Sequence, residues 1–341
     1  MPADDTRVIP SDRISTARGE IRADALGMTL THEHLFVWNP EFHQNYPALW
    51  DSAVGVERAA QKLERAYELG VRTIVDLTVL GQGRDPQLIA QVAEKTRVNI
   101  VLATGIYALD GLPQIVRYRG PGEIIDVPDP LVDLMEYDIR HGIAGTQAKA
   151  ALLKFACERQ EADPSLRRVA AAIAEVHSRT GVPVVVHTDP VDPNALLALD
   201  LLGKHGVAPG NVVLAHAGDI TDAGYLREVA ESGAYIGCDR FGMVMVPEEQ
   251  RISNVTDLVA RGHLRQLLLS HDCASFIDHF PEEVRQAMMP DWSYDHLPQR
   301  VIPALRQAGL DDGQLTTLFE ENPRRLLTGR TSAAQGATHA G

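Results

Sequence analysis

Two histidines and a glutamate stand at the end of the first apolar run of this sequence. Residues 28–38 read MTLTHEHLFVW, which places His32 and His34 two positions apart. Residues with that spacing point to the same face of a β-strand, where two imidazoles could bind one metal ion. A polar loop that follows a strand is the alternative, and this motif alone does not decide between the two.

Four further side chains that can bind a metal occupy comparable positions in later apolar runs. They are Lys154 in AALLKFA, His187 in VPVVVHT, His216 in NVVLAHAGD and Asp272 in RQLLLSHDC. Any one of them alone could be an ordinary core or loop residue. Their joint placement indicates a single site, because the carboxyl ends of barrel strands meet at one rim.

The lysine has apolar neighbours on both sides. A lysine is rarely buried without a partner, and a bare ammonium would repel a cation held by histidines. Three explanations stay open: a salt bridge, a lowered pKa for Schiff-base chemistry, and conversion by carbon dioxide to a carbamate. A carbamate on Lys154 would be an anionic ligand able to bridge two metal ions. Four imidazoles, a carboxylate and a carbamate suit two divalent ions such as Zn²⁺.

The apolar runs predict the elements that position these residues. They are nearly continuous in apolar residues, which indicates parallel strands buried on both faces. The expected strands are 28–34, 72–79, 98–107, 149–156, 182–188, 211–219, 234–240 and 265–273. Amphipathic stretches between them, such as 56–70 and 167–181, end on a glycine and predict helices. This alternation predicts an α/β fold, a closed (β/α)₈ TIM barrel with the metal centre at its C-terminal rim, and a doubly wound open sheet is the alternative.

The chain is expected to form one domain, because no linker rich in proline, glycine or serine divides it. Residues 1–20 are expected to be a short N-terminal extension and residues 21–328 the barrel. Residues 329–341 have the composition of a disordered tail.

The composition excludes several classes of function. The 341 residues carry a formal net charge of −14, and 45% of them are hydrophobic. The acidic balance argues against nucleic acid or an anionic membrane as a partner. No apolar run reaches the length of a membrane span, and no signal peptide is visible. Three widely spaced cysteines fit a reducing compartment, so we expect a cytoplasmic protein.

Five motifs, in this order, resemble those of the phosphotriesterase family of the amidohydrolase superfamily. They are THEH, the strand lysine Lys154, VVVHT, LAHAGD and SHD, and the resemblance spans about residues 20–328. Within that family, GRD (83–85), TGIY (104–107), GCDRFG (237–242) and LSHDCAS (269–275) are similar to the phosphotriesterase-like lactonases. Those enzymes open N-acyl-homoserine lactones, the signals of bacterial quorum sensing. The resemblance therefore implies a quorum-quenching lactonase.

The resemblance also implies a metal-binding role for each motif residue. One divalent ion would be bound by His32, His34 and Asp272. A second would be bound by His187 and His216, and N6-carboxylysine at Lys154 would bridge the two ions. Zinc is expected, with cobalt, manganese and iron as alternatives.

The same resemblance implies a mechanism. A hydroxide that bridges the ions would attack the lactone carbonyl, Asp272 would take its proton, and Asp219 would relay that proton. Tyr107 would stabilise the oxyanion or orient the lactone ring, and Arg240 would orient a loop or the substrate amide. A rim tyrosine is the alternative for Tyr107, and a structural ion pair is the alternative for Asp219 and Arg240. Further substrate contacts are expected from Cys273, Phe276, Ile277 and Trp292.

Other functions remain open at this point. A phosphotriesterase or carboxylesterase on the same two metal ions is the main alternative. A metal-free Schiff-base enzyme that uses Lys154 and a non-catalytic barrel are the others. The expected partner is a small-molecule lactone, and the expected assembly is a homodimer that binds neither nucleic acid nor membrane.

Overall fold

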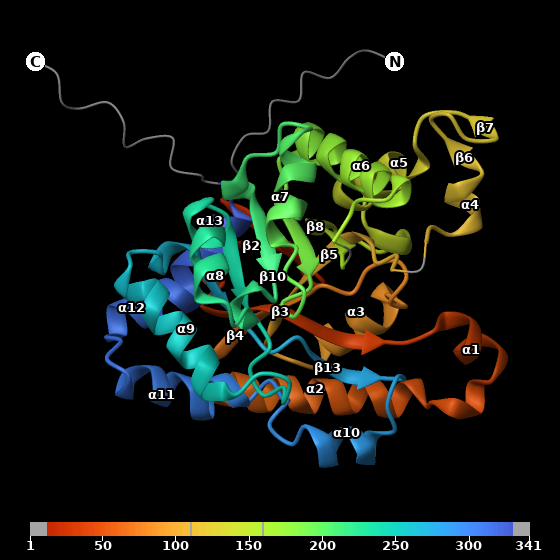
Figure 1. Cartoon of the computed structure of the whole chain (residues 1–341). Helices are drawn as coiled ribbons and strands as arrows, with labels where there is room; N and C mark the ends of the chain where they lie inside the picture. The colour runs from red at the N-terminus through yellow and green to blue at the C-terminus, as the bar shows by residue number, and fades with distance from the viewer. Residues whose placement is uncertain (1–11, 110, 159, 330–341) are drawn as a thin grey trace, which may run out of the picture.

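A curled parallel sheet wrapped by helices forms the body of the protein (Figure 1). The computed structural model describes residues 12–109, 111–158 and 160–329. Hydrogen-bonded neighbours run in the order β12-β11-β10-β9-β8-β5-β4-β3-β13, and every adjacent pair is parallel. The strands are β3 (Met28–Val37), β4 (Val71–Asp76), β5 (Asn99–Ile106), β8 (Ala150–Cys157), β9 (Val184–Thr188), β10 (Val212–Ala215), β11 (Tyr235–Cys238), β12 (Leu267–Leu269) and β13 (Cys273–Ile277). The predicted (β/α)₈ fold is confirmed.

The eighth strand differs from its expected form because it is split in two. It ends at Leu269, turns through residues 270–272 and resumes at Cys273. Its first half, β12, pairs with β11, and its second half, β13, pairs with β3 and so closes the barrel. The first strand is also longer than expected, because pairing with β13 extends it to Val37.

Seven helices follow the first seven strands and cover the outside of the barrel. They are α2 (Ser52–Glu68), α3 (Pro86–Glu94), α5 (Pro130–Arg140), α6 (Pro164–Thr180), α7 (Ala195–Gly203), α8 (Ala223–Glu231) and α9 (Glu248–Ala260). Three of them begin at an Asp-Pro pair, in which the aspartate caps the free N–H groups and proline presets the first helical residue. Helix α6 ends at Gly181, whose left-handed φ of 71° is the predicted glycine cap.

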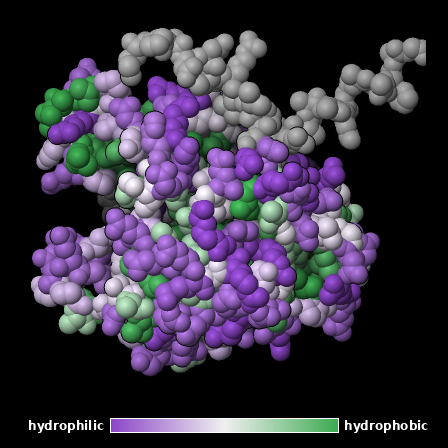
Figure 2. Space-filling view, turned by 180° about the vertical axis from the view of Figure 1, so that it is seen from behind, coloured by the Kyte–Doolittle hydropathy of each residue, from purple (hydrophilic) through white to green (hydrophobic). Residues whose placement is uncertain are grey.

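Shorter elements complete the described residues. The remaining α-helices are α1 (Pro40–Asn45), α4 (Gln114–Arg117), α10 (Glu282–Met288), α11 (Ile302–Gln307), α12 (Asp312–Thr316) and α13 (Asn322–Leu327). Single 3₁₀ turns span Ala23–Ala25, Pro47–Leu49, Ile143–Gly145, Pro209–Asn211, Ala217–Asp219 and Leu264–Gln266, and π-helical turns span Leu297–Val301 and Thr317–Glu321. Strands β6 (Arg119–Gly120) and β7 (Ile125–Asp126) lie on a segment that projects from the body, where hydrophobic residues gather on an otherwise mostly hydrophilic face (Figure 2).

A hairpin lies against the barrel at the start of the described chain. Strands β1 (Arg13–Thr16) and β2 (Gly19–Arg22) are antiparallel, and the Ala17 N–H donates to the Ile100 carbonyl at 2.8 Å. Ile14 is buried among side chains of the barrel interior. The expected extension of residues 1–20 therefore overlaps this hairpin. Residues 1–11 and all but the first residue of the expected tail lie outside the described residues.

The core has two layers, which follow from the alternation of side chains along buried strands. One layer fills the barrel and includes Val101, Leu152 and Leu268. The other packs between strands and helices and includes Ile100 and Leu153. Within the described residues, no helix combines the length and the apolar character that crossing a membrane requires. The rigid barrel thus holds its strand ends, and the side chains on them, in fixed positions.

Candidate metal centre and active site

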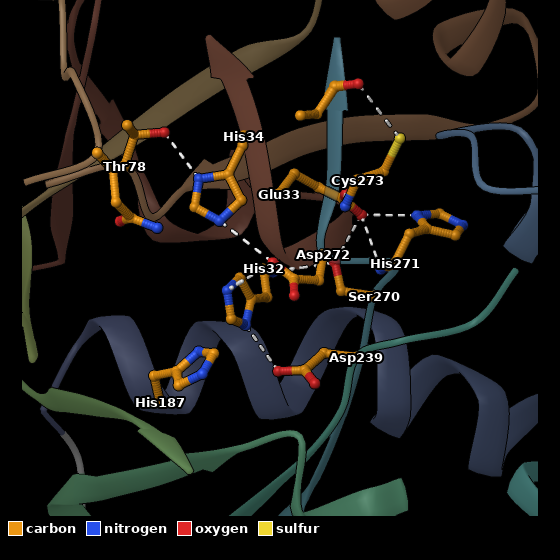
Figure 3. Close-up of polar contacts among 12 residues, drawn as sticks. His32, Glu33, His34, Thr78, His187, Asp239, Ser270, His271, Asp272 and Cys273 are labelled. Atoms are coloured by element: carbon orange, nitrogen blue, oxygen red, sulfur yellow. Dashed lines mark hydrogen bonds and ion pairs between the residues drawn. The ribbon is translucent and has the colours of Figure 1, made fainter. Parts of the chain in front are cut away.

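Five of the predicted metal-binding residues meet at the C-terminal rim of the barrel, and Figure 3 labels four of them, His32, His34, His187 and Asp272. The Nε2 atoms of His32 and His34 lie 3.3 and 3.2 Å from Oδ1 of Asp272. Nε2 of His216 lies 3.8 Å from Oδ2 of Asp272 and 2.8 Å from Nδ1 of His187. Residues from strands far apart in the sequence therefore point at one small volume.

Lys154 reaches the same place from β8. Its side chain is buried and lines the cavity together with His34, His187 and Asp272. No ion pair of Lys154 is found in the described part of the chain, so the salt-bridge explanation has no partner there. Burial lowers the pKa of Lys154 to about 8, although nearby carboxylates oppose the shift. A neutral amine, the form that adds carbon dioxide, is therefore well populated in mildly alkaline solution.

A second layer of hydrogen bonds orients the imidazole rings. One oxygen of Asp239 lies 2.7 Å from Nδ1 of His32, and its other oxygen lies 2.8 Å from Nδ1 of His216. The Thr78 hydroxyl lies 2.7 Å from Nδ1 of His34. With Nδ1 engaged in this way, the Nε2 lone pairs of His32, His34 and His216 are free to face the centre.

The ionisation of these groups suits a cation. Burial lowers the pKa of His34, and it lowers the pKa of His216 far below its ordinary value, so both rings are neutral ligands near pH 7. Burial alone would raise the pKa of Asp239, but His216 and His32 hold it well below its usual range. Asp272 behaves in the same way: burial opposes ionisation, yet the pKa is well below normal because His32 and His216 face it.

Two buried side-chain atoms of the described residues have no hydrogen-bond partner, Nε of Arg240 and Nε2 of His32. Nε2 of His32 forms no hydrogen bond within the described residues, although it is inaccessible to solvent. Ligand atoms of His32, His216 and Asp272 lie within 4.8 Å of one another, which is close enough for a single ion. An unsatisfied buried nitrogen beside a carboxylate and neutral imidazoles fits a divalent metal centre.

Two of these residues have an unusual backbone. His216 has φ of 66° and Asp272 has φ of 53°, both in the left-handed region that non-glycine residues rarely adopt. Such a conformation costs about 1–3 kcal/mol and persists only where surrounding contacts hold it. His216 directly follows the last residue of β10, and Asp272 lies in the break of the eighth strand. At both positions the left-handed backbone aims the side chain inward.

The expectation for Asp219 is not met. Its carboxylate forms a buried two-point ion pair with Arg251 of α9, at 2.7 and 2.8 Å, rather than a contact with Asp272. The structural ion pair considered as the alternative therefore exists, but its cation is Arg251. Arg240 instead lies beside Asp272, with Nε 3.7 Å from Oδ2 and without a hydrogen bond to the described residues.

The comparisons with known proteins now decide the family. Residues 12–327 match the sequence model of the Phosphotriesterase family. The chain belongs to the phosphotriesterase family. The predicted resemblance is confirmed, the protein is a hydrolase of this family, and the His/Asp cluster fits the family's binuclear divalent metal site.

Several relatives in the phosphotriesterase family are similar over nearly the whole chain. A phosphotriesterase homology protein of Mycobacterium tuberculosis is 43% identical, over 92% of this chain and 97% of its own length. An aryldialkylphosphatase of Saccharolobus solfataricus is 31% identical, over 91% of this chain and 98% of its own. The solved structure of the phosphotriesterase from Mycobacterium tuberculosis superposes with a TM-score of 0.90 at 42% identity, covering 92% of this chain and 98% of that one.

Tyr107 lies at this phosphotriesterase-family site, where it has a partner that the sequence analysis missed. Its hydroxyl donates to Glu158 at 3.3 Å and lies 3.5 Å from Nε2 of His187. Glu158 also forms a short contact with Nε2 of His187. Burial and the Glu158 carboxylate raise the pKa of Tyr107, so its phenol stays a hydrogen-bond donor.

Signals for the two missed carboxylates were present in the sequence. Glu158 lies four positions after Lys154, so along an extended strand both point to the same face. Asp239 directly follows β11, at the same rim as the predicted ligands, and directly precedes Arg240. Both could have been found by asking which acidic residues share a strand end with a predicted ligand.

A large cavity opens over the cluster. Its volume is about 1060 Å³, and its lining includes Tyr107, Arg240, Ile277 and Trp292, four of the residues expected to contact substrate. Its other apolar walls come from Trp38, Val37, Leu80, Leu109, Met243, Met245, Phe280 and Met289.

Two of the predicted substrate contacts do not face this cavity. The Cys273 thiol is buried and donates to the Trp292 carbonyl at 3.3 Å, because the residue after Asp272 on the resumed strand points to the opposite face. Phe276 packs against Trp50, with ring centroids 5.0 Å apart. Ala274 and Ile277 are the residues of β13 that line the cavity.

Proposed function

We propose that the protein is a metal-dependent lactonase that opens the ring of N-acyl-homoserine lactones. The observation that carries the proposal is the cavity over the metal-binding cluster. It combines the polar groups of the metal-binding cluster, and further polar residues such as Asn39 and Gln82, with apolar side chains such as Trp38, Met243 and Phe280, which suits a polar ring attached to an acyl tail. The lactonase-like motifs of the sequence, TGIY and GCDRFG, contribute Tyr107 and Arg240 to this cavity.

The proposed metal centre has two positions. His32, His34 and Asp272 would hold one divalent ion, His187 and His216 would hold the other, and Lys154, carboxylated by carbon dioxide, would bridge them. When bound, two such ions supply Lewis acidity toward a carbonyl oxygen and lower the pKa of water. Zinc suits this set of nitrogen and oxygen ligands.

The protein's own groups would handle the proton and the substrate. Oδ2 of Asp272 faces the cavity beside Arg240, where it can accept a proton from water and return it to the leaving alkoxide. The Tyr107 hydroxyl would donate to the ring oxygen or carbonyl, exchanging its bond to Glu158 for one to the substrate. Nε of Arg240, which has no hydrogen bond to the described residues, could donate to the amide carbonyl.

Phosphotriester hydrolysis is the second candidate. The relative from Saccharolobus solfataricus named aryldialkylphosphatase supports it at 31% identity. Two metal ions stabilise a tetrahedral phosphorus centre with much the same groups as a tetrahedral carbon centre.

Steady-state kinetics on a panel of substrates separates the two candidates. We expect kcat/KM for N-acyl-homoserine lactones to exceed that for paraoxon by orders of magnitude and to rise with acyl-chain length. Tyr107→Phe should impair lactone opening more than paraoxon hydrolysis, because only the former is proposed to use the hydroxyl. A higher kcat/KM for paraoxon would refute the lactonase and leave the metal centre untouched.

A further inference from the structure

The glutamate between the two histidines of the first strand points away from the metal-binding cluster. Alternation along β3 sends Glu33 to the opposite side from His32 and His34, where its side chain is fully buried. A buried carboxylate is unfavourable unless its lone pairs are satisfied. The groups that satisfy it all lie at the break in the eighth strand (Figure 3).

Four donors from the residues on either side of Asp272, namely Ser270, His271 and Cys273, converge on this carboxylate. Oε1 accepts from the Ser270 hydroxyl at 2.7 Å, from the His271 backbone N–H at 3.1 Å and from Nδ1 of His271 at 2.6 Å. Oε2 accepts from the Cys273 N–H at 2.9 Å. Glu33 thus binds the chain on both sides of Asp272.

The backbone of the first strand holds the residue in between. The Asp272 N–H donates to the His32 carbonyl at 3.0 Å, and the His32 N–H donates to the Ser270 hydroxyl at 2.9 Å. The strand ladder itself is interrupted here, because β12 pairs with β11 and β13 pairs with β3. The side chain of Glu33 therefore supplies the bonds that the ladder lacks between residues 270 and 273.

We propose that Glu33 is the positioning residue for Asp272. By fixing Ser270, His271 and Cys273, its carboxylate holds the left-handed turn at Asp272, which aims the Asp272 carboxylate at His32 and His34. Without the four bonds, the turn relaxes toward an ordinary strand conformation and Asp272 leaves the cluster. The inference rests on the metal-binding part of the proposed function.

The same residue connects the cluster to the cavity wall. Nε2 of His271 accepts from the Leu297 N–H at 2.9 Å, so Nδ1 carries the proton that it donates to Glu33. The His271 carbonyl accepts from Nε1 of Trp292 at 2.9 Å, and Trp292 lines the cavity. Glu33 thereby fixes the segment after the eighth strand together with Asp272.

Glu33→Gln tests the proposal with little change in side-chain size. An amide has one acceptor oxygen, so its NH₂ group must face a donor, either the Cys273 N–H or the donors at Ser270 and His271. Glu64→Gln is the matched control, because Glu64 also accepts several hydrogen bonds, from Thr96 and Arg97, but on the outside of the barrel. Hydrogen–deuterium exchange of residues 270–273 and zinc affinity by chelator competition are measured on each purified protein.

We expect Glu33→Gln to speed exchange at residues 270–273 and to weaken zinc binding by about 10–100-fold, while Glu64→Gln does neither. The visible spectrum of the cobalt-substituted protein should change for Glu33→Gln, which a general loss of stability would not produce. Unchanged exchange and unchanged zinc affinity would overturn the proposal.

The same experiments remain decisive in two further cases. If Glu33→Gln does not fold, Ser270→Ala provides the second test, because it removes one of the four donors. It should speed exchange at residues 270–273 and weaken zinc binding, each by less than the effect expected for Glu33→Gln. An unchanged Ser270→Ala protein would then contradict the proposal. If the unmodified protein binds no zinc, the proposed metal centre fails, and the exchange measurement alone decides the role of Glu33.

Discussion

Lys154 is the residue on which the proposed two-metal centre depends most, because a carbamate on its side chain is the ligand proposed to bridge the two ions. It is buried beside His34 and His187 with its pKa lowered to about 8, so its amine can react with carbon dioxide near neutral pH. Lys154→Ala should therefore lose most bound metal and most activity. Short carboxylic acids added to the solution should restore part of both, because their carboxylate can occupy the place of the carbamate.

The control for this variant is a partly buried lysine, Lys62. Lys62 has a pKa lowered by burial and donates to the Ser275 carbonyl at 2.8 Å, outside the cluster. Lys62→Ala should reduce stability and keep its metal. A Lys154→Ala protein with full metal content by elemental analysis would contradict the bridging role.

Glu158 should matter through His187 and Tyr107 rather than through direct binding of a metal ion. Its carboxylate holds Nε2 of His187, which leaves Nδ1 to face His216. We expect Glu158→Gln to weaken binding of the second metal ion by about 10–100-fold, as measured by metal titration. Glu136→Gln, which removes a carboxylate paired with Arg140 and Arg179 on the surface, should leave the titration unchanged. Equal titration curves for the two variants would refute this role.

The sequence predicts the metal-binding residues better than it predicts the residues that orient them through hydrogen bonds. His32, His34 and Asp272 can be placed together because strand ends of a barrel share one rim. Thr78 escapes such reasoning, since an ordinary threonine near a strand end has no distinctive spacing, whereas Asp239 and Glu158 carry only the weaker signal of an acid that shares a strand end with a predicted site residue. Their roles follow only from hydrogen-bond geometry, as does the contact of Asp219 with Arg251.

At the scale of elements, the turn Ala217–Asp219 and helix α9 are joined by one buried ion pair. Asp219 and Arg251 are both 2% exposed, and Arg251 also donates to the Met243 carbonyl at 2.6 Å. Asp219→Asn leaves a buried guanidinium without its counter-charge, so the free energy of unfolding should fall by about 3–5 kcal/mol in chemical denaturation. The Asp219→Asn protein should retain its bound metal at denaturant concentrations below its unfolding transition.

An exposed pair provides the comparison for this variant. Asp257 and Arg261 form an ion pair on the solvent side of α9. Asp257→Asn should change the free energy of unfolding by less than about 1 kcal/mol. If Asp219→Asn instead kept its stability and lost turnover, the proton-relay role expected from the sequence would be right after all.

The order of elements follows from sequence patterns, but the break in the eighth strand does not. In RQLLLSHDC the polar residues Ser270, His271 and Asp272 read as the end of a strand, and nothing in the pattern shows that the strand resumes after them. The break depends on bonds to Glu33, more than two hundred residues earlier in the chain. Contacts over such separations are set by the closed barrel and are invisible to a local pattern.

At the scale of the whole molecule, the barrel separates stability from chemistry. The hairpin lies near the start of β5, where the Ala17 N–H donates to the Ile100 carbonyl, and the cluster and cavity lie at the carboxyl ends of the strands. Closure of the barrel could be predicted from eight repeated units, whereas the size of the cavity could not, because its walls come from loops after several strands. The expected homodimer stays a prediction.

Metal content measured together with activity tests the central claim most directly. We predict about two divalent ions per chain in the fully active protein by elemental analysis, with anomalous X-ray scattering placing one beside His32 and His34 and the other beside His187 and His216. Removal of both ions by a chelator should abolish lactone hydrolysis, and zinc should restore it. A metal-free chain that hydrolyses lactones at the full rate would contradict the account.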